Sequence, residues 1–392
     1  MVFVMTACAE NSSQSEKSQP AEQTTVQPTT MSAEEINDRK LDKFISDMTL
    51  EEKVGQMFFV RCPDEDAVKQ VSEYNIGGYI LFGRDLDGKT KDEVVDDIHS
   101  YQDEADIPLL IGVDEEGGTV VRVSSNPNLR ETPFLSPKDT YADGGWDAVK
   151  QDAEEKADLL LSLGINVNLA PVCDMTSDEY GFMYDRSFSS DLDMENRYVR
   201  TVVETSKSKK LGTVLKHFPG YGNNSDTHTG IAYDDRDYSE FENTDFKPFY
   251  QGIESGADCI LVSHNIVNCM DSEYPASLSQ KVHDILRNEF KFDGVIMTDD
   301  LIMDAITDFT GDEAAAVAAA KCGNDLLCCS SVDTQYPAVL EAVQNGEIPE
   351  TQVDASVKRI LKWKQNLGIF NIDNYQKKVK STEPTDTVGS EE

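Results

Sequence analysis

The chain has 392 residues and a large acidic excess, with 73 Asp and Glu against 35 Lys and Arg, which gives a net charge of −38. A field of that sign repels nucleic acid and anionic membrane surfaces, so neither is an expected partner. No apolar run is long enough to cross a membrane. The length fits one large α/β domain with tails, or two smaller domains.

Cysteine usage indicates free thiols. The chain is long, and most of its eight cysteines lie in apolar runs, which is typical of buried thiols rather than of a disulfide framework. Adjacent Cys328 and Cys329 would point to opposite faces of a strand, so they are not expected to pair with each other. No C-x-x-C pair exists, and we expect neither a metal site nor a cofactor.

The first 32 residues are predicted to lie outside the folded domain. Met5-Thr6-Ala7-Cys8 resembles the end of a bacterial lipoprotein signal, whose cysteine carries the lipid. Residues 9–31 are rich in Ser, Gln, Thr, Glu and Pro and cannot bury a core, which predicts a flexible tether. Together they predict membrane anchoring through a lipidated Cys8 at the extracellular face of a bacterial cell. The alternative is a disordered leader on a secreted or cytoplasmic protein.

Helical and strand-like segments alternate from residue 32 onward. Thr49 and Glu52 form a capping box at a predicted helix start. Eight short apolar runs are typical of buried strands: 57–60, 78–82, 109–113, 167–170, 214–217, 259–262, 295–297 and 326–328. The predicted helices between and after them are 91–104, 148–163, 194–210, 277–290, 313–322, 337–343 and 351–367.

This alternation predicts a parallel sheet closed into a single (β/α)8 TIM-type barrel over residues 33–372. An open doubly wound sheet is the alternative, but no G-x-G-x-x-G follows any strand. The helix at 351–367 is expected to pack on the outside. Residues 373–392 contain little apolar surface and are predicted to be a disordered acidic tail.

Polar side chains follow every predicted strand, as expected if they converge on one mouth of a barrel. They are Arg61; Arg84 and Asp85; Asp114, Glu115 and Glu116; Asp174; Lys216 and His217; Ser263, His264 and Asn265; Thr298, Asp299 and Asp300; Ser330 and Ser331. A sheet built only for stability would not need carboxylates and imidazoles at so many strand ends. A ligand or catalytic site is therefore predicted at this mouth.

Two groups of residues suggest acid/base and nucleophilic chemistry. Asp226 and His228 are two residues apart, so the carboxylate can orient the imidazole and stabilise its protonated form. Asp299 directly follows a buried strand, where a carboxylate can act as nucleophile, metal ligand or general base, and Asp300 competes for the same role. A carboxylate nucleophile with a separate proton donor is the logic of a retaining glycosidase.

A metal site is the minority alternative at this mouth, and its candidate ligands are Asp114, His217, His264 and Asp299. The remaining histidines, His99 and His283, are predicted to be surface or packing residues. His264 fits a site wall and a buried core imidazole equally well. The acidic runs at 234–237 and 38–47 are predicted to be solvated faces.

Six motifs together resemble the β-N-acetylglucosaminidase branch of glycoside hydrolase family 3, over roughly residues 33–370. They are Lys216-His217-Phe218-Pro219-Gly220; Asp226-x-His228; Val113-Asp114-x-Glu116-Gly117-Gly118; Ala170-Pro171-Val172 with Asp174; Asp185-Arg186-Ser187-Phe188; and Thr298-Asp299-Asp300-Leu301-x-Met303. The resemblance implies a monomeric retaining exo-enzyme that releases terminal β-linked N-acetylglucosamine from cell-wall or chitin-type oligosaccharides.

The resemblance also implies residue roles. Asp299 would be the nucleophile, His228 the acid/base and Asp226 the residue that orients His228. The substrate-binding positions would be Asp114, Arg122, Arg186, Lys216 and His217, and we add His264 as a candidate. Three departures from the family pattern are visible. The segment that ends at Arg122 departs from the pattern at Thr119, and Tyr221 stands where the family often has a second histidine. The segment Asn223-Asn224-Ser225 is one residue shorter than in relatives.

Two alternative functions remain open at this level. A β-N-acetylglucosaminide phosphorylase would use the same chemistry with phosphate as acceptor, because a histidine acid/base does not repel phosphate as a carboxylate would. A non-catalytic sugar-binding lipoprotein would keep the barrel without turnover. The altered segment after Tyr221 motivates the second alternative, and intact Asp226, His228 and Asp299 argue against it.

Overall fold

A computed structural model describes residues 1–2, 31–222, 224 and 230–375. Backbone contacts divide the chain after Arg39 into two units, and the fold described below is that of the unit beginning at Lys40. Helix α1 (Ala33–Ser46) spans this division. Cys8, nearly all of the predicted tether and most of the predicted tail lie outside the described residues. No helix in the described part of the chain has the length and apolar composition needed to span a bilayer.

Eight parallel strands form one sheet in the order β10-β1-β2-β3-β4-β5-β7-β9. Their bounds are β1 Phe58–Arg61, β2 Gly78–Leu81, β3 Leu110–Val113, β4 Val167–Asn168, β5 Gly212–Phe218, β7 Cys259–Val262, β9 Val295–Thr298 and β10 Leu327–Cys329. A parallel bridge between Met297 and Leu326 joins the two edges, so the sheet closes almost completely. The predicted (β/α)8 barrel is confirmed, and the open doubly wound sheet is wrong.

The strands are short and apolar because both of their faces are buried. Along β1, Phe58 packs with the outer core under the helices, whereas Phe59 packs with the core inside the barrel. Cys328 faces the inner core and Cys329 the outer core, as predicted for neighbouring strand residues. The seven described cysteines are free thiols, and all but Cys269 are buried.

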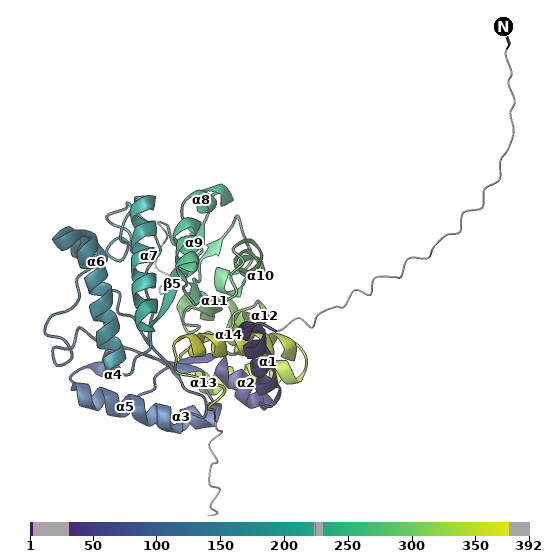
Figure 1. The fold of residues 1–392 in the computed structure, drawn as a ribbon, viewed down its shortest axis with the longest axis horizontal. Helices are drawn as coiled ribbons and strands as arrows, with labels where there is room; N and C mark the ends of the chain where they lie inside the picture. The colour runs from purple at the N-terminus through teal and green to yellow at the C-terminus, as the bar shows by residue number, and fades with distance from the viewer. Residues whose placement is uncertain (3–30, 223, 225–229, 376–392) are drawn as a thin grey trace, which may run out of the picture. The chain divides into compact units, whose positions relative to one another are not determined.

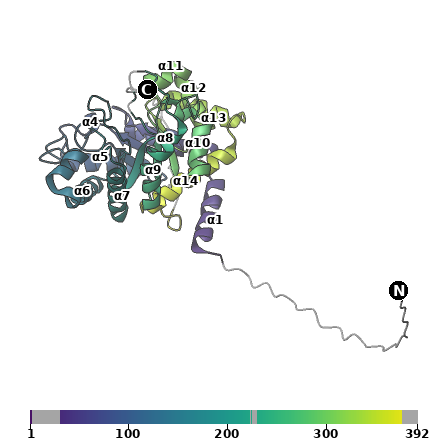
Figure 2. The same ribbon diagram turned by 90° about the horizontal axis from the view of Figure 1, so that it is seen from above.

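Helices surround the sheet, and α6, α7 and α9 lie side by side along one flank (Figure 1), in an arrangement that Figure 2 shows from above. Beyond α1, the helices are α2 Leu50–Gln56, α3 Ala67–Tyr74, α4 Gly83–Leu86, α5 Lys91–Glu104, α6 Pro137–Ser162, α7 Leu192–Lys209, α8 Tyr238–Asn243, α9 Phe246–Ser255, α10 Gln280–Asp284, α11 Asp304–Thr310, α12 Asp312–Lys321, α13 Val332–Gln344 and α14 Glu350–Asn366. A second, two-stranded parallel sheet pairs β6 (Tyr233–Asp234) with β8 (Ile266–Val267).

Several predicted helix bounds are wrong for local reasons. Helix α6 starts eleven residues earlier than predicted, where Ser136 caps it ahead of Pro137, but Gly144 and Gly145 interrupt its helical backbone, which hid the first half. Helix α13 begins before Pro337, because a buried face that includes Tyr336 and Val339 outweighs the hydrogen bond that a proline removes. The predicted helix at 277–290 divides into a 3-10 turn, α10 and a π-helical turn.

Helix α14 also differs from its predicted place outside the barrel. Ile360, Trp363 and Leu367 pack with the inward-facing side chains of the strands, so this helix covers the amino end of the barrel interior. Lys364 is 0% exposed, and its Nζ donates a hydrogen bond to Gln56 Oε1 at 2.8 Å. Burial lowers the pKa of Lys364 to about 7, because the charged ammonium loses its water shell without gaining a carboxylate.

This burial makes the stability of the fold depend on pH. Above pH 7 the folded state holds Lys364 neutral, while the unfolded chain stays protonated up to the ordinary pKa of 10.5. The unfolded state therefore binds more protons, and stability should rise with pH. The free energy of unfolding of the wild type, minus that of Lys364→Met, should increase by about 1.4 kcal/mol per pH unit between pH 7 and 9. Urea unfolding at both pH values checks this, and a constant difference would contradict it.

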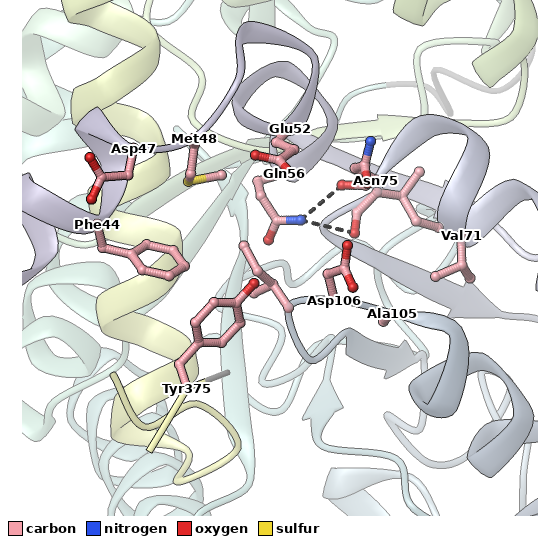
Figure 3. Close-up of a pocket in the computed structure, with 12 residues that line it drawn as sticks. Phe44, Asp47, Met48, Glu52, Gln56, Val71, Asn75, Ala105, Asp106 and Tyr375 are labelled. Atoms are coloured by element: carbon pink, nitrogen blue, oxygen red, sulfur yellow. Dashed lines mark hydrogen bonds between the residues drawn. The ribbon is translucent and has the colours of Figure 1, made fainter. Parts of the chain in front are cut away.

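A cavity of about 290 Å³ lies beside this region at the amino ends of β1, β2 and β3 (Figure 3). Phe44, Met48 and Tyr375 contribute apolar surface to its wall. Gln56 donates from Nε2 to the backbone oxygens of Asn75 and Ile76 at 2.8 and 3.3 Å. Barrel enzymes carry their chemistry at the carboxyl ends of the strands, which form the mouth opposite to this cavity.

Candidate active site

A cavity of about 680 Å³ opens at the carboxyl ends of the strands. Its volume lies within the usual range of small-molecule sites. Leu169, Leu261 and Cys328 form an apolar floor that belongs to the filled barrel interior. The polar wall comes from segments far apart in the chain: Arg61, Asp114, Glu116, Arg122, Asp185, Arg186, Lys216, His217, Tyr221, Asp299 and Asp300.

Lys216 is the centre of a buried charge network. Its Nζ lies 2.6 Å from Asp114 Oδ1 and 2.7 Å from Glu116 Oε1. Arg186 donates from Nε and Nη2 to the two oxygens of Glu116, at 2.9 and 2.7 Å. Although burial opposes ionisation, the cations Lys216 and Arg186 hold the pKa of the Glu116 carboxyl well below its usual range. Lys216, Arg186 and Glu116 thus stay charged together although their side chains are largely buried.

The loop after β3 is fixed by the neighbouring carboxylate. Glu115 is fully buried and accepts hydrogen bonds from the backbone N–H groups of Arg122 and Val123 at 2.9 and 2.7 Å. Asn168 on β4 binds the backbone of Glu115 through both of its amide atoms. These contacts hold Asp114 and Arg122 at the cavity wall, so the substrate side of this loop is preorganised.

His217 is held in one tautomer by its two partners. Its Nδ1 lies 2.7 Å from Asp174 Oδ2, and its Nε2 lies 3.2 Å from Arg186 Nη2. Since a guanidinium only donates, Nε2 accepts and Nδ1 carries the proton that is donated to Asp174. Asp174 also accepts from the backbone N–H of Tyr221 at 2.7 Å. Tyr221, which stands where the family often has a histidine, therefore helps to fix the turn that leaves β5.

The two candidate nucleophiles differ in their surroundings. Asp300 accepts a hydrogen bond from the Ser330 hydroxyl at 2.5 Å and from the backbone N–H of Ile302 at 3.2 Å. Burial raises the pKa of Asp300 above its usual range. Asp299 Oδ1 accepts from the backbone N–H of Asp300 at 2.9 Å, and Asp299 lines the cavity directly after β9. The carboxylate of Asp300 thus helps to build the turn, and the role of nucleophile that the motifs assign to Asp299 stays a prediction.

Two arginines present unsatisfied donors at this mouth. Arg61 at the end of β1 lies 4.6 Å from the centre of the Phe82 ring, and Arg122 lies 6.0 Å from it. The Nε atoms of both are buried and have no hydrogen-bond partner among the described residues. Buried donors of this kind are normally satisfied, and both residues line the cavity.

Six predicted site residues line this one cavity: Asp114, Arg122, Arg186, Lys216, His217 and Asp299. His264 does not line it. That imidazole is fully buried, contacts Ser277 Oγ at 2.7 Å and donates from Nε2 to the backbone oxygen of Asp300 at 3.0 Å, so it supports the turn after β9 from behind. Asp226 and His228, with Asn223 and Ser225, lie outside the described residues.

The four candidate metal ligands do not fit a metal site in this geometry. Asp114 is paired with Lys216, and His264 belongs to the core, so the four candidate ligands do not converge. Across residues 1–2, 31–222, 224 and 230–375, no group of three His, Cys, Asp or Glu side chains could hold a metal ion.

The acidic run at 234–237 is only partly the solvated face that was predicted. Asp234 is buried rather than solvated, because Arg236 pairs with it, whereas Asp235 is exposed.

Two residues of the predicted mouth, Glu116 and Asp174, were assigned no role in binding or catalysis. Glu116 and Asp174 each lie in a quoted motif at a strand end, and that position was the available signal. Their function depends on partners: Glu116 joins Lys216 to Arg186, and Asp174 orients His217. Sequence spacing does not reveal such pairings, because the partners come from different strands.

A nearly closed parallel barrel with a polar cavity at its carboxyl-end mouth is the usual arrangement of a (β/α)8 barrel enzyme. The family assignment agrees, since a model described as the glycosyl hydrolase family 3 N terminal domain matches residues 49–363. The chain belongs to glycosyl hydrolase family 3. It is a glycoside hydrolase, and the resemblance seen in the motifs is confirmed.

Similar proteins are named for hexosaminidase activity. A "Beta-hexosaminidase" from Nitrosomonas eutropha is 32% identical over 273 residues, which cover 68% of this chain and 77% of that protein. A solved glycoside hydrolase family 3 beta-N-acetylglucosaminidase from Paenibacillus sp. has a TM-score of 0.77 and 29% identity, covering 88% of this chain and 66% of that one. The structure of LpqI from Mycobacterium tuberculosis has a TM-score of 0.75 and 27% identity, covering 83% and 96%.

Proposed function

We propose that the chain is an exo-acting retaining β-N-acetylglucosaminidase that releases terminal β-linked N-acetylglucosamine from cell-wall or chitin-type oligosaccharides. One observation carries the proposal: six predicted residues from the ends of four strands and the loops after them line a single cavity. The names of the similar proteins support the same sugar.

In the proposed first step, Asp299 attacks the anomeric carbon and His228 protonates the leaving oxygen, which gives a glycosyl ester on Asp299. In the second step His228 removes a proton from water, water attacks the same carbon, and the carboxylate leaves. Two inversions give net retention. Asp226 would orient His228 and stabilise its protonated form during the first step.

The buried charge network would bind the sugar before chemistry begins. Asp114 can accept hydrogen bonds from ring hydroxyls, while Lys216 and Arg186 can donate to them. The Nε2 atom of His217 already accepts a hydrogen bond from Arg186. This imidazole therefore lines the site and also orients the guanidinium group. Hydrogen bonds to charged groups contribute about 1.5–3 kcal/mol each, which is enough to select one sugar over another.

Turnover of nitrophenyl glycosides tests the proposal. The wild type should release nitrophenol from the β-N-acetylglucosaminide much faster than from the β-glucoside, and proton NMR should show the β-anomer of N-acetylglucosamine as first product. Release of the α-anomer first would contradict the retaining mechanism. Binding of N-acetylglucosamine without turnover would instead favour a sugar-binding protein.

Phosphate addition separates hydrolysis from phosphorolysis. In phosphate buffer the hydrolase should still yield free N-acetylglucosamine, with less than about one tenth of the product as sugar 1-phosphate, because water at its high concentration competes for the glycosyl ester. Mass spectrometry of the products measures the ratio. A predominance of sugar 1-phosphate would show a phosphorylase.

Attachment to a membrane through a lipid on Cys8 is a separate part of the proposal. It is motivated by Met5-Thr6-Ala7-Cys8 and by the polar stretch that follows it. Mass spectrometry of the N-terminus from the native host should find a diacylglyceryl group on Cys8. An unmodified Cys8 would contradict anchoring and would leave the catalytic proposal unchanged.

A further inference from the structure

Arg61 stands across the barrel mouth from the charge network of Lys216. In the nearly closed sheet, β1 is separated from β5 by β2, β3 and β4 in one direction and by β7, β9 and β10 in the other. Arg61 is the last residue of β1, and Lys216 belongs to β5. Both residues line the active-site cavity, so its polar wall has two separate cationic regions.

The two cationic regions differ in how their charges are neutralised. Lys216 pairs with Asp114 and Glu116 at 2.6 and 2.7 Å. Arg61 forms no ion pair with a carboxylate in the described part of the chain, and its buried Nε atom has no hydrogen-bond partner there. Partly buried cations are costly unless they are paired. Arg61 therefore carries a charge that no described side chain neutralises by direct contact.

The carboxylates nearest to Arg61 are used by their own turns. Asp85 accepts a hydrogen bond from the backbone N–H of Phe82 at 2.7 Å and lies 3.5 Å from Arg84 Nε. The carboxylate of Asp300 is bound within the turn after β9. Burial raises the pKa of both carboxyls, and the charge of Arg61 opposes that rise from a distance. The Phe82 ring, 4.6 Å from the guanidinium carbon, favours a fixed position of the Arg61 cation.

Arg61 also borders a second cavity, with a volume of about 340 Å³. This cavity and the active-site cavity share Arg61 and Ile302 as wall residues. In the proposed mechanism the anomeric carbon lies at Asp299 and the ring hydroxyls lie at the Lys216 network. The β-linkage is equatorial, so the leaving group continues away from those hydroxyls, toward the side of the mouth that holds Arg61 and Ile302.

We propose that Arg61 is a specificity-determining residue that binds a carboxylate carried by the leaving group, so that acidic aglycones are preferred over neutral ones. A guanidinium group matches a carboxylate in shape and charge. Because the chain has a net charge of −38, a local cation is needed to offset the repulsion of an acidic substrate. The inference rests on the proposed function, and it favours cell-wall fragments, in which muramic acid carries a lactyl carboxylate, over chitin-type oligosaccharides.

Two disaccharides that differ in a single charge give the test: N-acetylglucosaminyl-β-1,4-N-acetylmuramic acid and its methyl ester. Because the glycosidic oxygen is the same in both, a difference in rate reports recognition of the carboxylate. The wild type should have a kcat/KM about 10 to 100-fold higher for the acid, as expected for hydrogen bonds to a charged group. Arg61→Met should bring the acid to within about threefold of the ester and leave the ester nearly unchanged. Arg61→Lys, which keeps the charge but loses the forked geometry, should show an intermediate preference.

Arg84→Met is the matched control. Arg84 lines the same second cavity and is 35% exposed, but it already pairs with Asp64 at 2.7 Å. Its replacement should leave the ratio of the two kcat/KM values unchanged. Retention of the preference for the acid in Arg61→Met, or its loss in Arg84→Met, would overturn the inference.

Binding measurements keep the two proposals distinguishable. In Asp299→Asn, calorimetry should give a Kd for the acid that is lower than that for the ester by about 10-fold or more, and adding Arg61→Met should remove the difference. Equal or undetectable binding of the two disaccharides by Asp299→Asn would overturn the inference whatever the turnover of the wild type. Failure of the wild type to cleave a nitrophenyl β-N-acetylglucosaminide, whose leaving group has no carboxylate, would instead count against the proposed function alone.

Discussion

Replacement of Asp299 by Asn should abolish turnover, with kcat/KM for a nitrophenyl β-N-acetylglucosaminide falling by about 10⁴-fold or more. Asn is nearly isosteric but cannot attack the anomeric carbon as a carboxylate, and loss of a nucleophile removes the covalent path entirely. The fold should persist, because the amide oxygen of Asn can accept the hydrogen bond that Asp299 Oδ1 accepts from the backbone N–H of Asp300. Initial rates with both enzymes measure the effect.

Asp300→Asn is the matched control for this prediction. Asp300 precedes Leu301 in the same turn, and its carboxylate is bound to Ser330 and Ile302. Its replacement should weaken the turn and lower kcat/KM by about 10 to 100-fold, far less than the loss of a nucleophile. A fluorinated glycoside should form a stable ester on the peptide that contains Asp299, and mass spectrometry would locate it. An ester on Asp300, or full activity of Asp299→Asn, would refute the assignment.

Replacement of Glu116 by Gln should cost about 3–5 kcal/mol of stability, the usual penalty for breaking a buried ion pair and leaving a charge unpaired. Glu116 is 4% exposed, and it binds both Lys216 and Arg186. When the charge of Glu116 is removed, Lys216 keeps its ion pair with Asp114. Arg186 loses the carboxylate that accepts two of its hydrogen bonds. Urea unfolding at pH 7 measures the loss, and the rate on a nitrophenyl glycoside should fall as well, because both cations shift in the sugar site.

Glu350→Gln provides a matched control, since Glu350 also pairs with a buried lysine, Lys53, at 2.8 Å, but is itself 58% exposed. Water compensates an exposed carboxylate, so this change should cost less than about 1 kcal/mol. An equal loss in the two variants would contradict the role given to burial.

The ion pairs of Glu116 also make the stability of the fold depend on pH. Because the folded-state pKa of Glu116 is depressed, its contribution is fully present above the unfolded pKa of 4.5 and is lost as the pH falls below that value. Glu116→Gln should therefore show less acid destabilisation than the wild type below pH 4.5.

Local signals in the sequence were sufficient for the barrel and for most of the site. Short runs such as 259–262 and 295–297 are apolar on both faces, and this pattern depends on the sheet being covered on both sides rather than on any particular partner. Residues just after such runs, including Asp114, Lys216 and Asp299, must then meet at one mouth, because parallel strands end on the same side. The sequence by itself thus determined the architecture and placed Asp114, Lys216 and Asp299 at one mouth, whereas Arg122 and Arg186 were predicted only through the family resemblance.

Only the tertiary structure decided what those residues do to one another. Whether His264 faces the cavity or the core, and whether Asp234 meets water or Arg236, depends on packing between elements far apart in the chain. The same holds for Glu116 between Lys216 and Arg186. A residue's type and its place after a strand follow from local pattern, whereas its burial and its charge partner arise from the closed barrel, where side chains from different strands share one volume with little water.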